Sequence, residues 1–271
     1  MDLLKAIHWQ DDRFTLAGYT FLLQHQRSEN TAEDGFVLYK NRRQLEQYQR
    51  LFNESGFRPR TVLELGIWDG GSAAFWAETL GVTRYAAIDL QDRGDSNYFR
   101  KWSAERGNGR VSTHWGVSQD DPVALQAILA DGLLPLDMVI DDASHMPGPS
   151  LRSFELLFPK LAPGGFYVLE DWSWALQPEF QPADHAWSTL PALHPIVHSL
   201  LDLHGSRPEL ISMLYVYPDA VIAQRGQAGC EVLNVERAIV RRHRPWRRIA
   251  ALKVRHTLGN ARRFVERRSG V

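Results

Sequence analysis

Cysteine is almost absent from this 271-residue sequence, in which Cys230 is the single example. One cysteine cannot form an intrachain disulfide, and it cannot supply a cysteine-rich zinc site or an iron–sulfur cluster. Apolar runs of 18 residues are also missing, and the first ten residues carry Asp2, Lys5 and His8 in place of the apolar block of a signal peptide. We therefore expect a protein without a transmembrane segment that resides in the reducing cytoplasm.

Net charge is almost absent, at -1, because 31 Lys and Arg residues nearly balance 32 Asp and Glu residues, but the charges are unevenly distributed. Residues 237–271 hold twelve Lys and Arg residues against the single acidic Glu266, so the preceding residues carry the compensating negative excess. Part of this basic tail has a pattern compatible with an amphipathic helix. We expect the tail to be solvated or docked on an acidic surface, and nucleic acid or an anionic membrane are the alternative partners.

Apolar runs and helical patterns alternate along the middle of the chain. The runs predict strands over 60–65, 85–90, 110–115, 136–140 and 166–169, helices over 71–80, 122–131 and 151–161, then a helix over 196–204 and a hairpin of 210–217 and 220–224. Such alternation is typical of a parallel sheet with helices on both faces. We predict an α/β fold with a Rossmann-like, seven-stranded, mostly parallel sheet that ends in an antiparallel hairpin.

Three segments follow from this division of the chain. Residues 1–56 form an N-terminal cap that contains an amphipathic helix over 35–52, residues 57–226 form the α/β domain, and residues 227–271 form the basic tail. The secondary structure of residues 1–34 is not specified by their pattern.

A glycine-containing loop lies between the first predicted strand and the helix that follows it. Its residues are Glu64, Gly66, Gly70, Gly71 and Ser72. Glycine allows a backbone to pass close to a ligand and to adopt positive φ, and a helix N-terminus suits a carboxylate or a phosphate. The glycine spacing differs from the dinucleotide pattern G-x-G-x-x-G, and an acidic Glu64 would repel a pyrophosphate. A cationic sulfonium ligand fits this loop better.

A second acid, Asp89, closes the second predicted strand, where it is placed to accept hydrogen bonds from ribose hydroxyls. Taken singly, the glycines could form a plain turn and Asp89 could cap a helix. The set as a whole favours a nucleoside-containing ligand.

Carboxylates also follow the fourth and fifth predicted strands. Asp141, Asp142 and His145 come after the fourth strand, and Glu170 and Asp171 come after the fifth. Because the carboxyl ends of parallel strands meet at one edge of a sheet, we expect these groups to converge there. The alternative is that Asp141 and Asp142 cap the next helix and that His145 is a solvated loop residue.

Such a cluster of like charges needs a counter-charge. No basic residue lies nearer in the sequence than Arg152 or Lys160. Protonation or a more distant Lys or Arg would serve, but an oxygen-rich set of ligands suits Mg²⁺ or a similar hard cation.

The motif Glu64-x-Gly66-x-x-x-Gly70, the acid Asp89 and the order of strands resemble class I S-adenosylmethionine-dependent methyltransferases over residues 35–224. The Asp142-x-x-His145 and Glu170-Asp171 positions resemble a bacterial group of metal-dependent sugar and natural-product O-methyltransferases, the macrocin O-methyltransferase and cephalosporin-hydroxylase-like group. The resemblance implies roles for individual residues. Donor-binding residues would be Glu64, Gly66, Gly70, Ser72, Asp89, Ser118, Gln119 and Asp120; Mg²⁺ ligands would be Asp142, Glu170 and Asp171; and His145, with Asp142, would be catalytic, His145 as general base.

The sequence thus predicts transfer of a methyl group from S-adenosylmethionine to a hydroxyl of a small sugar or natural product. Trp172, Trp174 and Trp187 could stack on that acceptor or pack against the sheet edge. A metal-independent methyltransferase is the alternative within enzymes. A nucleic-acid or membrane-binding module with a vestigial fold is the alternative from another class, and a homo-oligomer is compatible with each of them.

Overall fold

The computed structural model describes residues 7–23 and 35–240. The described residues up to Ile239 belong to one compact unit. Most of the predicted basic tail, from residue 241 onward, lies outside the described residues. Within the described part of the chain, every helix is too short or too polar to cross a bilayer.

The larger of two sheets has seven strands in the order β10-β11-β9-β8-β5-β6-β7. These strands are β5 (Thr61–Leu65), β6 (Arg84–Asp89), β7 (Val111–Trp115), β8 (Leu136–Asp141), β9 (Leu161–Glu170), β10 (Ile211–Val216) and β11 (Ala220–Arg225). Neighbouring pairs among β5 to β9 are parallel, whereas β11 is antiparallel to both β9 and β10. The prediction of a mostly parallel seven-stranded sheet with a terminal hairpin is confirmed.

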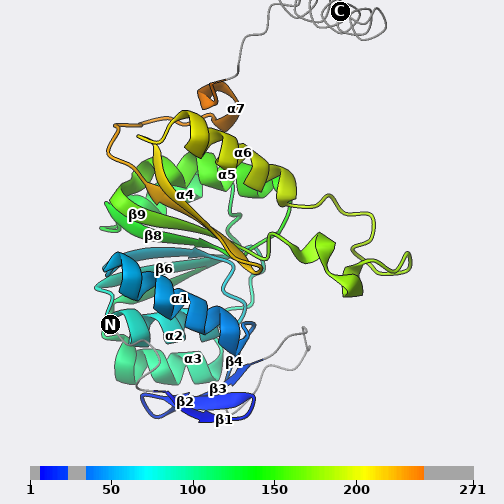
Figure 1. Cartoon of the computed structure of the whole chain (residues 1–271). Helices are drawn as coiled ribbons and strands as arrows, with labels where there is room; N and C mark the ends of the chain where they lie inside the picture. The colour runs from blue at the N-terminus through cyan, green and yellow to red at the C-terminus, as the bar shows by residue number, and fades with distance from the viewer. Residues whose placement is uncertain (1–6, 24–34, 241–271) are drawn as a thin grey trace, which may run out of the picture. The chain divides into compact units, whose positions relative to one another are not determined.

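Helices cover both faces of this sheet (Figure 1). One face carries α4 (Pro122–Ala130), α5 (Pro147–Leu157) and α6 (His194–Ser206), and the other carries α1 (Arg42–Ser55), α2 (Gly71–Leu80) and α3 (Asn97–Trp102). Because successive strand residues point to opposite faces, the strands feed two apolar cores: Val62 and Met138 belong to one, Leu63 and Val139 to the other. Burial on both faces explains why these strands read as continuous apolar runs.

The N-terminal segment folds as a second sheet, which the sequence did not specify. Its strands are β1 (His8–Gln10), β2 (Arg13–Leu16), β3 (Tyr19–Leu23) and β4 (Phe36–Leu38), in that order. Aromatic side chains join this sheet to α2 and α3: Phe14 stacks on Phe21 and meets the edge of Phe75, and Phe36 meets Trp102. The small sheet is thereby part of the same core as one face of the large sheet.

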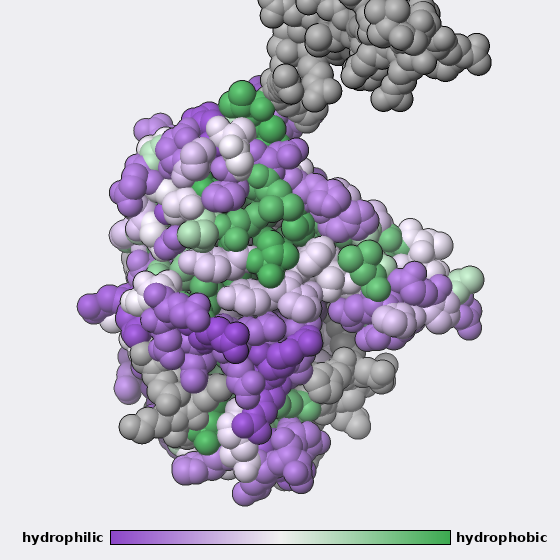
Figure 2. All heavy atoms as spheres, viewed as in Figure 1, coloured by the Kyte–Doolittle hydropathy of each residue, from purple (hydrophilic) through white to green (hydrophobic). Residues whose placement is uncertain are grey.

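Helix α1 follows β4 almost directly and packs against one face of the large sheet. The Asn41 side chain accepts a hydrogen bond from the Gln44 N–H and begins the helix, and Gly56, in the left-handed conformation, ends it. Leu45, Tyr48 and Phe52 point into the core, whereas the outward face is hydrophilic (Figure 2). The predicted amphipathic helix is confirmed, although it begins seven residues later than 35 because β4 occupies part of that range.

We expect Phe14→Ala to lower the free energy of unfolding by about 3–5 kcal/mol, because it removes a fully buried ring from the contact between the small sheet and α2. Urea unfolding followed by circular dichroism measures the change. Val123→Ala, at an exposed position of α4, is the matched control and should change stability by less than about 0.5 kcal/mol. A small effect of Phe14→Ala would show that the N-terminal sheet unfolds independently of the large one.

Candidate active site

A cavity of about 1440 Å³ opens where the parallel strands end. It is larger than the roughly 300–1,000 Å³ usual for one small ligand, so it has room for two molecules side by side. Its lining comes from the loops after β4, β5, β6, β7, β8 and β9. The predicted site residues among the lining are Gly66, Ser72, Asp89, Ser118, Gln119, Asp142, His145 and Asp171.

Gly66 brings the loop after β5 against the loop after β8. Its φ is +88°, and a Cβ at this position would lie 2.2 Å from the Asp142 carbonyl oxygen. No other residue fits so close an approach without moving the backbone. The loop after β5 and the acidic segment after β8 are therefore in direct backbone contact.

Gly70 serves packing and does not line the cavity. It has a φ of +91°, and the Phe99 ring of α3 occupies the space a Cβ would need, at 2.3 Å. The structure thus shows a contact of Gly70 with α3. Glu64 is likewise absent from the lining: it is fully buried, it accepts a hydrogen bond from Tyr85 Oη at 2.8 Å, and burial raises its pKa to about 8.

Asp89 lines the cavity and also holds the neighbouring loop. Its carboxylate accepts hydrogen bonds from the N–H groups of Trp68 at 3.0 Å, Ile67 at 3.3 Å and Gln91 at 2.8 Å. The predicted position at the strand end is found, and part of the acceptor capacity of Asp89 is used to shape the loop itself. Asp120, in contrast, points to the surface, where Arg152 and Ser118 donate to it.

Gln119 connects the loop after β7 to the acidic loop after β8. Its Nε2 donates to Asp141 Oδ1 at 3.0 Å, and its Oε1 accepts from the Ser144 N–H at 2.9 Å. Asp141 is buried and also accepts from Ser153 and Tyr167, each at 2.8 Å. Of the two neighbouring acids, Asp141 supports the loop and Asp142 faces the cavity.

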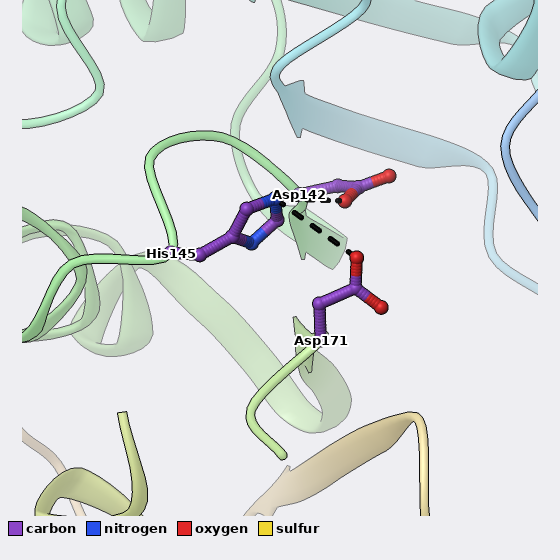
Figure 3. A group of neighbouring side chains, drawn as sticks. All are labelled: Asp142, His145 and Asp171. Atoms are coloured by element: carbon purple, nitrogen blue, oxygen red, sulfur yellow. Dashed lines mark ion pairs between the residues drawn. The ribbon is translucent and has the colours of Figure 1, made fainter. Parts of the chain in front are cut away.

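Asp142, His145 and Asp171 converge at the cavity wall (Figure 3). His145 Nε2 lies 3.9 Å from Asp142 Oδ1 and 4.0 Å from Asp171 Oδ2. One ligand atom from each residue falls within 4.8 Å of the others, so the three could hold a metal ion. His145 and Asp171 have positive φ, 53° and 51°, a strained conformation that is often found at functional sites.

Lys40 supplies the counter-charge that the sequence did not locate. It follows β4, its side chain is 1% exposed, and its Nζ lies 3.1 Å from Asp142 Oδ2 and forms a short ion pair with Glu170. Tyr48 of α1 donates to the other oxygen of Glu170. Glu170, a predicted metal ligand, thus has Lys40 and Tyr48 as partners of its two oxygens and is not among the residues that line the cavity.

Burial and mutual repulsion shift the pKa values of Asp142, Glu170 and Asp171. Burial raises the pKa of Glu170 to about 7 although Lys40 opposes the change. Burial also raises the pKa values of Asp142 and Asp171, against the lowering effect of Lys40 on Asp142 and of His145 on Asp171. Burial alone would lower the pKa of Lys40, but Asp142 and Glu170 outweigh it and hold the ammonium charged.

Aromatic side chains from the segment after β9 form the outer part of the cavity. Trp174 and Trp187 line it and pack against each other at 5.1 Å between ring centroids. Trp174 Nε1 also donates to the His145 carbonyl oxygen at 3.2 Å, so it supports the backbone of the acidic loop. Trp172 does not line the cavity, and its indole donates to the Tyr217 carbonyl.

Comparison with known proteins fits this geometry. Residues 63–172 match a family model described as a methyltransferase domain. The matched residues are less than half of the chain. The match begins within β5 and ends just after Asp171, so it contains the loops after β5 to β9 but not Lys40 or Tyr48.

Two curated relatives are similar to half or more of this chain. The 8-demethyl-8-alpha-L-rhamnosyl tetracenomycin-C 2'-O-methyltransferase of Streptomyces olivaceus is 34% identical over 143 residues, 50% of this chain and 35% of that protein. Demethylmacrocin O-methyltransferase of Streptomyces fradiae is 34% identical over 171 residues, 60% of this chain and 40% of that protein. The aligned region thus covers well under half of each relative.

A solved structure shares the architecture. It is the MycE methyltransferase of the mycinamycin biosynthetic pathway, determined in complex with Mg and SAH, with a TM-score of 0.50 and 26% identity over 67% of this chain and 48% of that chain. The Rossmann-like methyltransferase fold predicted from the strand order is confirmed.

We expect Gly66→Ala to destabilise the methyltransferase domain by more than about 3 kcal/mol, because the new methyl group would overlap the Asp142 carbonyl. Gly18→Ala is the matched control: its φ is +87°, but a Cβ there meets nothing within 4 Å. The control should cost only the strain of the left-handed conformation, about 1–2 kcal/mol. Equal losses for the two variants in thermal unfolding would contradict the close approach of the two loops.

Proposed function

We propose that this chain is an S-adenosylmethionine-dependent O-methyltransferase that acts on a hydroxyl of a small sugar or natural product with the aid of a divalent cation. One observation carries the proposal: a single cavity joins the Gly66–Asp89 loops to the Asp142–His145–Asp171 cluster. The first part suits a methyl donor and the second suits activation of a hydroxyl. The names of the curated relatives, which are O-methyltransferases of glycosylated natural products, support the acceptor class.

The donor half of the cavity fits S-adenosylmethionine in its shape and chemistry. Gly66 lies in the wall of the cavity, Ser118 and Gln119 form its side, and Asp89 stands at the end of β6 and lines the cavity too. We assign the ribose to Asp89 and the adenine to the Ser118–Gln119 side. The volume left over accommodates an acceptor next to the aromatic wall.

The acidic half fits a hard cation. Asp142 and Asp171 each offer an oxygen to the cavity, and Mg²⁺ prefers oxygen ligands. A bound cation would polarise the acceptor hydroxyl and make its proton easier to remove.

His145 is our candidate for the general base. Its Nε2 faces the space between Asp142 and Asp171, where an acceptor hydroxyl would approach. In the reaction the acceptor oxygen bonds to the methyl carbon, the carbon–sulfur electron pair returns to sulfur, and the hydroxyl proton passes to His145 Nε2. The neighbouring carboxylates then stabilise the resulting imidazolium.

Calorimetric titration with S-adenosylmethionine, with and without Mg²⁺, tests the donor assignment, and methyl transfer to a panel of glycosylated acceptors tests the reaction. Absence of donor binding in both titrations would refute the proposed function.

The single cysteine favours a reducing compartment, and we propose the cytoplasm. We also propose that the protein self-associates and that residues 237–271 contact an acidic surface. Size-exclusion chromatography of the full chain and of a chain without residues 237–271 is the measurement for both proposals.

We expect His145→Gln to lower kcat by about 10²–10⁴-fold, because it removes the group that accepts the proton. The affinity for S-adenosylmethionine should change little, since His145 lies on the acidic side of the cavity. His114→Gln, on the edge strand β7 and outside the cavity lining, is the control and should leave both quantities unchanged. Full turnover by His145→Gln would exclude the histidine as base.

Chelation of divalent cations with EDTA should abolish most of the turnover, and added Mg²⁺ should restore it. Asp171→Asn should weaken the activating effect of Mg²⁺ by about 10-fold or more, because one cation-facing carboxylate is lost. Asp184→Asn removes an equal charge from an exposed position and serves as the comparison. Turnover that resists chelation would favour the metal-independent alternative.

A further inference from the structure

Trp68, in the loop after β5, has a strained backbone at the wall of the cavity. It lines the cavity together with Gly66 and Asp89, and its φ is +56°. A bulky L residue rarely adopts the left-handed region, because its Cβ crowds the neighbouring carbonyl. Glycine would adopt the same backbone freely, so the chain keeps an indole here at a cost. Strain of this kind persists only where the surrounding structure holds it, and it is often found at binding sites.

Contacts from two other segments hold Trp68 in this conformation. Its N–H donates to Asp89 Oδ2 at 3.0 Å. Its ring meets the Tyr39 ring at 88°, with 5.6 Å between the centroids. The guanidinium carbon of Arg93 lies over the ring, 3.7 Å from its centroid. A guanidinium is attracted to the face of an indole, so Arg93 stabilises the position of this side chain.

Arg93 is connected in turn to the end of β6. Its Nη2 donates a short hydrogen bond to Gln91 Oε1, and the Gln91 N–H donates to Asp89 Oδ1 at 2.8 Å. Asp89, Gln91, Arg93 and Trp68 thus form a closed set of contacts that joins the loop after β5 to the loop after β6. Three of the four line the cavity, and Arg93 is the exposed member that does not.

We propose that Arg93 is a positioning residue for the methyl donor, which acts by holding the Trp68 indole at the cavity wall. This inference rests on the proposed function, because it takes the ligand of this wall to be S-adenosylmethionine. The indole offers the donor a large apolar surface beside Asp89, the residue to which we assign the ribose. Arg93 contributes without touching the donor, since it keeps the strained conformation of Trp68 populated.

The size of the expected effect follows from the contact. A cation over the face of a tryptophan at an exposed position changes an equilibrium constant by about 2- to 5-fold. Without Arg93, Trp68 should leave the strained conformation for part of the time. Donor affinity then falls in proportion to the fraction of molecules that keep the binding conformation.

Calorimetric titration of the full chain with S-adenosylmethionine, and separately with S-adenosylhomocysteine, tests the inference. We expect Arg93→Ala to weaken the binding of both by about 2- to 5-fold. Trp68→Gly keeps the backbone conformation but removes the ring, and it should weaken binding by about 10-fold. The double variant should bind as Trp68→Gly alone does, because Arg93 then has no ring to hold. Arg100→Ala, which removes an exposed arginine that donates to Asn97, should bind as the wild type does.

Hydrogen exchange of residues 66–71 without any ligand gives a second measurement. We expect faster exchange of the Trp68 N–H in Arg93→Ala and wild-type exchange in Arg100→Ala. Unchanged donor affinity in Arg93→Ala, wild-type affinity in Trp68→Gly, or a further loss in the double variant would overturn the proposal. Failure of the wild type to bind S-adenosylmethionine would refute the proposed function. The exchange rates would still decide whether Arg93 holds Trp68, and equal rates in Arg93→Ala and the wild type would exclude it.

Discussion

Carboxylates of like charge can share the end of a parallel sheet only where their repulsion is offset, and the architecture around the cavity is arranged to meet that requirement. Strands β8 and β9 are adjacent and parallel, so Asp142 and the Glu170–Asp171 pair emerge side by side. The Lys40 ammonium, from a segment more than a hundred residues earlier in the chain, contacts Asp142 and Glu170. Helix α1, which follows Lys40, adds Tyr48 as a hydrogen-bond donor to Glu170.

A second close contact determines how the two parts of the cavity are joined. At Gly66 the backbone after β5 touches the backbone after β8, and the acidic loop is held from its other side by Gln119. Trp174 contributes a third support through its hydrogen bond to the His145 carbonyl. The loop with His145 and Asp142 is therefore fixed by three elements, which explains how it maintains a strained φ at His145.

Much of this arrangement was readable from the sequence, because parallel strands buried on both faces leave continuous apolar runs and their carboxyl ends must meet at one edge. That logic located Gly66, Asp89, Asp142, His145 and Asp171 at a common cavity. It placed Glu64, Gly70, Asp120 and Glu170 there too, but spacing along the chain does not tell which way a side chain turns. Glu64 turns to Tyr85, Gly70 packs on Phe99, Asp120 pairs with Arg152, and Glu170 pairs with Lys40.

Lys40 itself carried no local signal, since its partners lie more than a hundred residues away and no motif surrounds it. The small sheet escaped prediction for a related reason: β1 to β4 are short, and they pack against distant elements, among them α2 and α3. Both features arise from tertiary packing. Periodicity reports on the face an element buries, not on the distant residue that it meets.

The position of Lys40 and Tyr48 ahead of β5 bears on where the folded unit around the acidic cluster begins. A fragment starting at residue 57 would retain every strand of the large sheet and the whole of the region matched as a methyltransferase domain. It would nevertheless leave Glu170 with neither of its two donors. The smallest fragment that keeps these contacts is thus longer than the matched region, because Lys40 and Tyr48 both precede residue 63.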